Sequence, residues 1–317
     1  MLMMWFLQEV ISKWLVTSSI SWWRNLRWLI SVLCPTFWAL KSSKDDGIFI
    51  HPRKFSVEFL KKFKMEDSNS VKTPIETEIK LTKEDDGRIV DATYFKQIVG
   101  SLRYLTCTRR DICYVLRLVS RYMESPWQVH LQVVKRILRY IKGTTTFCLF
   151  YFSSKKIEIV GYSNRDWGGD LYERKNTSGH CFMIWKTFCL WSTKKQSIVA
   201  LSTCEAKYVA VTTNACQSDW LNNIMTQISF NLDVPIKIYV DNVYAINLAK
   251  NLVFHQRSKH IDIRYHFLRN QVGKNMIKLE YCISEDQIVD ILTNPLKIDA
   301  FIKLRHPLGM KVVLNHN

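Results

Sequence analysis

The sequence predicts an α/β fold in its second half, preceded by a mostly helical segment, and three observations lead to this prediction. After residue 150, short strand-like stretches alternate with helical ones, whereas before it apolar residues recur at helical spacing. The composition, 47% hydrophobic and 23% charged, is typical of a globular chain. The 317 residues are enough for two ordinary domains. We therefore expect a mixed five-stranded sheet with flanking helices behind a helical first domain.

In the first half, a turn at Asp45-Asp46-Gly47 leads into a strand at 48–50, and a short helix follows at 56–63. A polar connector covers 65–86, and Tyr94, Ile98, Leu102 and Leu105 mark a second helix. Ser125-Pro126 is typical of a helix start, and this third helix ends at Gly143.

In the second half, three successive strands open the pattern, and helices and strands then alternate. The strands are expected at 157–163, 179–185, 188–193, 236–240 and 276–282, and the helices at 202–216, 242–249, 260–272 and 284–292.

The first 42 residues differ from the rest. Six of the eleven tryptophans lie in this segment, and charged residues interrupt it before any apolar run reaches 18 residues. A membrane-spanning helix is therefore not expected, and a membrane-anchored protein is an alternative that rests on this segment alone.

The charge indicates the kind of partner. Lys and Arg number 45 against 28 Asp and Glu, a formal charge of +17, which favours a polyanion such as nucleic acid. On the helix before Gly143, the basic residues Lys135, Arg136, Arg139 and Lys142 form either a solvated face or a track for phosphates. The nine cysteines include no CxxC pair and are odd in number, which indicates buried thiols in a reducing, intracellular compartment. We expect no small-molecule cofactor, and the oligomeric state is open.

Three acids of the second half stand out. Glu205 lies three residues after Ser202, Asp241 ends a predicted strand, and Asp290 lies in the last predicted helix. Each has a simple structural explanation: a capping box, a helix N-cap, and a solvent-facing acid. Taken together, carboxylates from a strand end and from helices can hold two Mg²⁺ ions for phosphodiester hydrolysis.

The motifs around these acids resemble those of one family, in the family's order. In the second half they are GYSNRDWGGD (161–170), RKNTSG (174–179), WSTKKQ (191–196), ALSTCEAKY (200–208), DN (241–242), SKHIDIRYHF (258–267) and QIVDILTNPL (287–296). Upstream, IVGSLRYL (98–105) and RILRYIKGT (136–144) resemble the segment that links polymerase and ribonuclease H (RNase H) in the same elements. The chain thus resembles the C-terminal part of the Pol polyprotein of copia-type LTR retrotransposons.

The resemblance implies an RNase H-like fold that cleaves the RNA strand of RNA–DNA hybrids with two Mg²⁺ ions. Glu205, Asp241 and Asp290 are then catalytic, metal-binding acids, and the first acid of the set is replaced by Asn164. Asp166, two residues further on, is a possible substitute ligand. Because the first acid normally touches both ions, we expect impaired catalysis, which Asn164→Asp should restore. Lys207 replaces a family glutamate, and Asn294 replaces a family lysine.

The resemblance also implies the domain organisation. Residues 1–42 are unmatched, and we hypothesise that they are read out of frame. Residues 43–150 are a reverse-transcriptase remnant, 151–310 are the RNase H-like domain, and 311–317 are a tail. No Tyr-x-Asp-Asp motif for polymerase metal occurs in the sequence. The expected nucleic-acid-binding residues are Lys135, Arg136, Arg139, Lys142, Lys194, Lys195, Lys259, His260 and Arg264. The expected location is a cytoplasmic particle or the nucleus.

Three functional interpretations stay open: an impaired RNase H, a non-catalytic nucleic-acid-binding module, and the product of a decayed element with no present function. Hybrid-cleavage and binding assays separate the first two, and detection of the endogenous protein decides the third.

Overall fold

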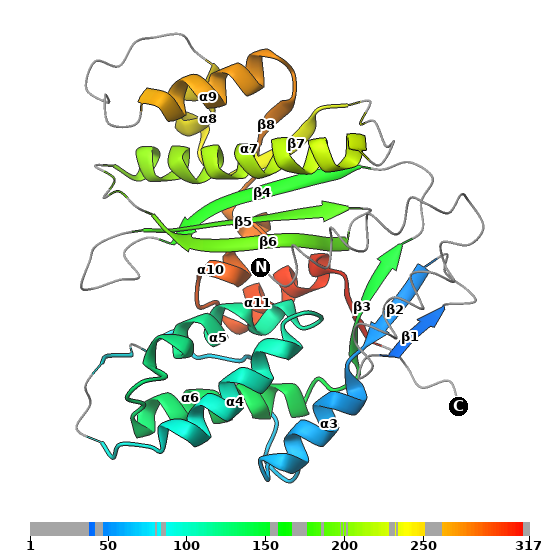
Figure 1. Cartoon of the computed structure of the whole chain (residues 1–317), viewed down its shortest axis with the longest axis vertical. Helices are drawn as coiled ribbons and strands as arrows, with labels where there is room; N and C mark the ends of the chain where they lie inside the picture. Colours follow the sequence, from blue (N-terminus) through cyan, green and yellow to red (C-terminus); the bar gives the residue numbers. More distant parts are fainter. Residues whose placement is uncertain are drawn as a thin grey trace. The chain divides into compact units, whose positions relative to one another are not determined.

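The computed structural model describes residues 38–41, 47–79, 81–83, 87–152, 158–166, 176–184, 187–196, 198, 200, 202–227, 232, 234–250 and 262–312. These residues form two compact units that divide near residues 153 and 293. Unit 1 combines residues 38–152 with 294–312, and unit 2 comprises the residues between them (Figure 1). In the described parts of the chain, no helix is both long and apolar enough to cross a membrane.

Unit 1 contains a helical layer built as the apolar spacing predicts. Its helices are α3 (Arg53–Lys62), α4 (Ala92–Leu105), α5 (Cys113–Val119) and α6 (Gln128–Lys142), with short 3₁₀ turns at Arg110–Ile112 and Ser120–Tyr122. Phe95, Ile98, Leu102, Ile137 and Ile141 are fully buried between them. The start of α6 differs from the prediction. Its N-cap is Trp127 rather than Ser125, and the Trp127 amide donates to His130 Nδ1 at 2.9 Å.

A four-stranded antiparallel sheet completes unit 1. It consists of β1 (Trp38–Lys41), β2 (Gly47–His51), β3 (Phe147–Phe152) and β9 (Met310–Val312), in that order. This organisation differs from the predicted bounds in two places. Residues 38–41, expected in the unmatched segment, pair with β2. Residues 294–312, expected mostly in the second domain, supply β9 and helix α11 (Ile298–Arg305) to unit 1.

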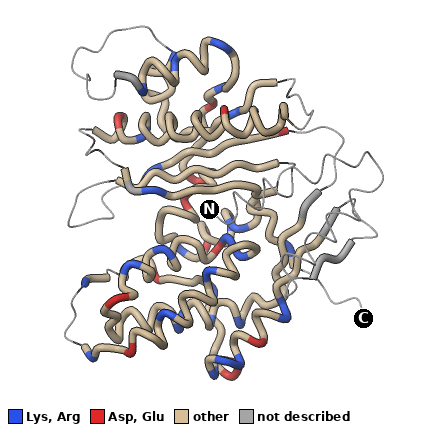
Figure 2. Tube along the Cα trace, viewed as in Figure 1, with Lys and Arg blue, Asp and Glu red and all other residues tan. Residues whose placement is uncertain are grey.

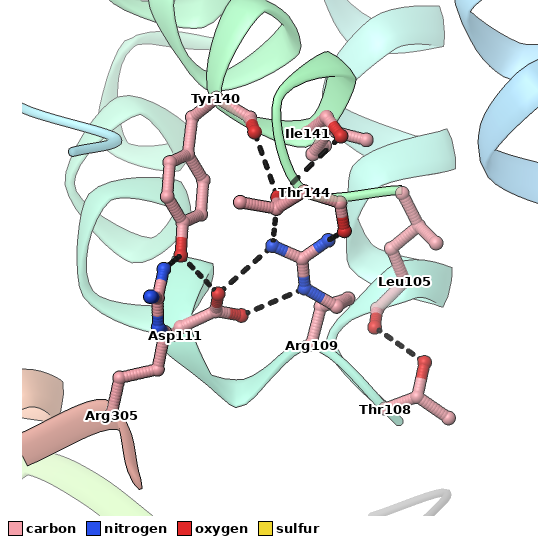
Figure 3. Close-up of polar contacts among 8 residues, drawn as sticks. All are labelled: Leu105, Thr108, Arg109, Asp111, Tyr140, Ile141, Thr144 and Arg305. Atoms are coloured by element: carbon pink, nitrogen blue, oxygen red, sulfur yellow. Dashed lines mark hydrogen bonds and ion pairs between the residues drawn. The ribbon is translucent and has the colours of Figure 1, made fainter. Parts of the chain in front are cut away.

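A buried polar network lies inside unit 1 (Figure 3). Arg109 and Asp111 have fully buried side chains and form a two-point ion pair, with Nε–Oδ1 at 3.1 Å and Nη2–Oδ2 at 2.9 Å. Arg109 also donates to the Thr144 carbonyl at 3.0 Å and to its hydroxyl at 2.6 Å. The Tyr140 hydroxyl donates to Asp111 and accepts from Arg305 of α11 at 3.0 Å. The network therefore joins the C-terminal segment to the helical layer.

Unit 2 is built on the predicted mixed five-stranded sheet. Its strands are β4 (Ile159–Asp166), β5 (Thr177–Ile184), β6 (Thr187–Lys195), β7 (Ile236–Val240) and β8 (Ile277–Tyr281). They are ordered β6-β5-β4-β7-β8, with β4, β7 and β8 parallel and the other pairs antiparallel. The predicted α/β fold class, a mixed five-stranded sheet with flanking helices, is confirmed.

Two faces of this sheet are covered by helices. Helix α7 (Thr203–Gln227) packs on β4 and β5, and α8 (Val243–Lys250) and α9 (Asp262–Gly273) pack against it. The short helix α10 (Asp290–Thr293) contacts the same two strands from the other side (Figure 1). The predicted last helix at 284–292 is wrong: that stretch is a 3₁₀ turn at Ser284–Asp286 followed by α10. Helix α7 also runs eleven residues past its predicted end at Cys216.

Candidate active site

The carboxyl ends of the three parallel strands bring together residues that are far apart in sequence. Ser163 pairs with Val240, and Val240 pairs with Tyr281, so the residues that follow them are neighbours on adjacent chain segments. These residues are Asn164, Asp241 and Cys282. Ligand sites of open α/β sheets gather at this edge because the strand ends and the following loops converge there. The structure therefore places positions 164 and 241 side by side at neighbouring strand ends.

Asn164 is buried in β4 and its amide has a defined orientation. Its Oδ1 accepts from the Arg165 backbone amide at 2.8 Å, and its Nδ2 donates to Asp290 Oδ1. The amide group therefore presents hydrogen atoms to Asp290, and its oxygen is turned toward the backbone. A metal ion needs an oxygen lone pair at this place. Asn164 is thus bound to the predicted ligand Asp290 but does not offer a ligand atom alongside it.

Asp241 follows β7 and its side chain is 7% exposed. Lys207 of α7 lies against it, with Nζ 2.6 Å from Oδ2. Within the described residues, Asp241 Oδ1 is buried without a hydrogen-bond partner. An ammonium group therefore stands beside the carboxylate that was predicted to hold Mg²⁺, and half of the carboxylate is engaged with it.

Glu205 lies in the first turn of α7 and is buried. Its backbone amide donates to Ser202 Oγ at 3.1 Å, which is the serine half of the predicted capping box. Asp166 ends β4 and pairs with Thr177, but its side chain lies outside the described residues. In the described chain, no group of three or more His, Cys, Asp or Glu side chains is arranged to hold a metal ion.

One residue near the acids, Cys282, was not predicted from the sequence. Cys282 accepts from the Gln287 side chain at 3.4 Å, and burial, together with Asp241, Asp286 and Asp290, raises the pKa of its thiol to about 12. Such a thiol stays protonated and is not a nucleophile. Cys282 ends a predicted strand, and this position could have placed it near the site from the sequence alone.

Close packing holds α10 on the sheet. A Cβ atom built on Gly179, which pairs with Asn164, would lie 2.4 Å from Thr293 Cγ2 and 2.8 Å from Val289 Cγ1. Gln287 has a fully buried side chain whose Nε2 donates to the Ser163 carbonyl at 3.2 Å. These two contacts fix Asp290 beside Asn164.

Comparison with known proteins identifies the family. No family model matches the chain. A retrovirus-related Pol polyprotein from transposon RE1 of Arabidopsis thaliana is 36% identical over 264 residues, and one from transposon TNT 1-94 of Nicotiana tabacum is 34% identical over 271 residues. Each alignment covers 83% of this chain. The chain belongs to the copia-type retrotransposon Pol family.

This Pol chain spans about a fifth of the length of those relatives, 18% and 20% respectively. It also matches an uncharacterized mitochondrial protein of Arabidopsis thaliana, 30% identical over 55% of this chain and 72% of that protein. Among solved structures, a foamy viral protease–reverse transcriptase in complex with double-stranded DNA gives a TM-score of 0.42 at 9% identity. That match covers 77% of this chain and 38% of the viral one.

Lys and Arg residues occur along the described parts of both units (Figure 2), and the predicted nucleic-acid-binding residues among them occupy different environments. On α6, Lys135 is exposed and Lys142 is half-buried. Arg136 instead forms an ion pair with Glu76, and Arg139 donates to the Asn69 carbonyl at 2.7 Å, so both hold the polar connector.

The remaining predicted binding residues lie in unit 2. Lys194 is exposed on β6, and Arg264 is half-buried on α9. The side chain of Lys195 and all of Lys259 and His260 lie outside the described residues.

Proposed function

We propose that this Pol chain is an RNase H-derived module that binds RNA–DNA hybrids and cleaves the RNA strand poorly or not at all. Support for its ancestry comes from the family and from the sheet that gathers positions 164, 241 and 290. An intact site of this kind would use two Mg²⁺ ions. Among the residues present, Asp241 and Asp290 would be its carboxylate ligands, together with Glu205 of α7.

The observation that carries the impaired state is the contact between Asn164 and Asp290. A carboxylate at position 164 would add negative charge where two divalent ions meet, whereas the amide adds none and turns a donor toward the next ligand. This favours the non-catalytic interpretation over an active nuclease.

Binding is supported by the formal charge of +17, carried by exposed residues such as Lys135 and Lys194. Contacts of this type recognise phosphates and A-form shape rather than base sequence. The affinity should therefore depend steeply on salt and little on sequence.

The test measures binding and cleavage on the same full-length protein. A labelled RNA–DNA hybrid should bind with an affinity that falls as salt rises, and prolonged incubation with Mg²⁺ should leave its RNA strand intact. Efficient cleavage that disappears in Asp241→Asn would refute the impaired site. Absence of hybrid binding at low salt would refute the binding function.

A further inference from the structure

The ion pair between Lys207 and Asp241 lies where the family resemblance predicts that Asp241 binds Mg²⁺. Lys207 lies two residues after Glu205 on α7, and its ammonium reaches Asp241 Oδ2 at 2.6 Å. The two side chains are 18% and 7% exposed. Ion pairs so far removed from water are screened much less than surface pairs, and breaking them leaves a buried charge.

A second contact also places a hydrogen-bond donor against a predicted metal ligand. The Asn164 amide donates to Asp290, and its orientation is fixed by the Arg165 backbone amide on its oxygen. The predicted ligands Asp241 and Asp290 therefore each have a proton donor against them. One donor brings a full positive charge and the other brings none.

We infer that the Lys207 ammonium is the resident cation of this site, so that a divalent ion does not bind at Asp241 while Lys207 is present. A divalent ion would have to displace an ammonium that is attached to α7 and pays no entropy of association. It would also have to shed part of its own hydration shell, which Mg²⁺ does reluctantly. The displaced Lys207 would then lie beside an ion of the same sign.

The inference concerns the site of the proposed function and rests on its assignment as a former metal centre. Its test is the binding of a metal ion alone, without nucleic acid. The two proposals can therefore fail separately: a chain that binds no hybrid and no metal would refute the first and support the second.

The experiment titrates the full-length protein with Mn²⁺ and follows the free ion by electron paramagnetic resonance. The chain as it stands should show no stoichiometric site. Lys207→Glu combined with Asn164→Asp should bind Mn²⁺ at least about tenfold more tightly, because the charge beside the ion changes from positive to negative. Lys207→Gln, which removes the charge without adding an acid, should show an intermediate gain.

Lys237→Glu, likewise combined with Asn164→Asp, is the matched control. It makes the same charge change on β7, where Lys237 pairs with Glu158 at 3.6 Å, four residues and roughly 13 Å along the strand from Asp241. It should leave Mn²⁺ binding unchanged. Stoichiometric Mn²⁺ binding by the unaltered chain that is lost in Asp241→Asn would overturn the inference, and this measurement stands even if the Lys207 variants fail to fold. Equal gains in the two double variants, Lys207→Glu with Asn164→Asp and Lys237→Glu with Asn164→Asp, would overturn it as well.

Discussion

The buried ion pair of unit 1 gives the sharpest stability prediction. Asp111→Asn keeps the shape of the side chain but removes the negative charge opposite Arg109. Both side chains are fully buried, so water does not replace the lost partner. Removing one member of such a pair costs about 3–5 kcal/mol, because the other charge stays buried. The Tyr140 hydroxyl also loses its charged acceptor, and through it the contact with Arg305 weakens.

The assay is hydrogen exchange of the full-length protein, followed peptide by peptide. A loss of about 3 kcal/mol corresponds to a roughly hundredfold loss of protection in α6, since each 1.4 kcal/mol is about tenfold. Peptides of β4 and β7 in unit 2 should keep their protection. The control is Asp67→Asn, at an exposed acid of the connector, which should change stability by less than about 0.5 kcal/mol. The reasoning would be refuted if Asp111→Asn and Asp67→Asn gave the same exchange.

The same pair predicts a response to acid. Burial alone would raise the pKa of Asp111, but Arg109 and the Tyr140 hydroxyl outweigh it and hold that pKa below its ordinary value. A lowered folded-state pKa means that the stabilisation is fully present above the unfolded pKa of about 4 and is lost as the pH falls through the folded value. The unfolding temperature of unit 1 should therefore drop in acid, and Asp111→Asn should flatten that dependence.

Three further outcomes are expected. Ending the chain at Thr293 removes α11 and β9, so limited proteolysis should digest unit 1 and spare unit 2; equal sensitivity of both units would contradict this. Gly179→Ala should destabilise unit 2 by about 1–3 kcal/mol in denaturant titrations, because the new methyl group would lie 2.4 Å from Thr293 Cγ2. Adding Thr293→Ser removes that Cγ2 methyl group and should recover part of the lost stability. No recovery would mean that this clash is not the cause. Lys135→Ala should lower the slope of log affinity against log salt by about one. Arg136 pairs with Glu76, so Arg136→Ala should leave the slope unchanged. Equal slopes for the two variants would argue against a phosphate contact at Lys135.

The fold of unit 2 could be predicted because its strands carry strong local signals and because family motifs order them. The length of α7 could not be predicted, because the polar stretch after Cys216 is typical of a helix end. In the structure Ser218 is buried with its hydroxyl donating to the Asn214 carbonyl, and Leu221 and Met225 continue the buried face. Tertiary packing therefore extends this helix beyond its local pattern.

The last predicted helix failed for a related reason. Its apolar spacing is helical, but Gln287 takes an extended backbone (ψ 94°) and buries its side chain. There its amide donates to the Ser163 carbonyl, a partner 124 residues away. A long-range hydrogen bond from a buried side chain has no signature in a local window of sequence.

The candidate site was predictable in position but not in contacts. Sequence alone places Asn164 and Asp241 at neighbouring strand ends and identifies Lys207 as a foreign charge. It does not say that Lys207 turns toward Asp241 or that the Asn164 amide turns toward Asp290, because side-chain direction depends on the packed surroundings. These two directions change the chemistry that the site can perform.

The two contacts also change what reversal of Asn164 should do. In Asn164→Asp, the donor that faces Asp290 becomes an acceptor, so two carboxylates meet at close range without a proton between them. Lys207 is already paired to Asp241, so its ammonium group is engaged elsewhere. The single reversal should therefore lower the stability of unit 2 and leave cleavage poor, contrary to the expectation from sequence alone. Adding Lys207→Glu removes the ammonium group beside Asp241, so divalent ions can bind there. In this double variant, the stability of unit 2 in Mg²⁺ and the cleavage of hybrid should both recover. A singly reverted chain that cleaves hybrid well would show that Lys207 moves aside freely, and that the lost carboxylate alone disables the site.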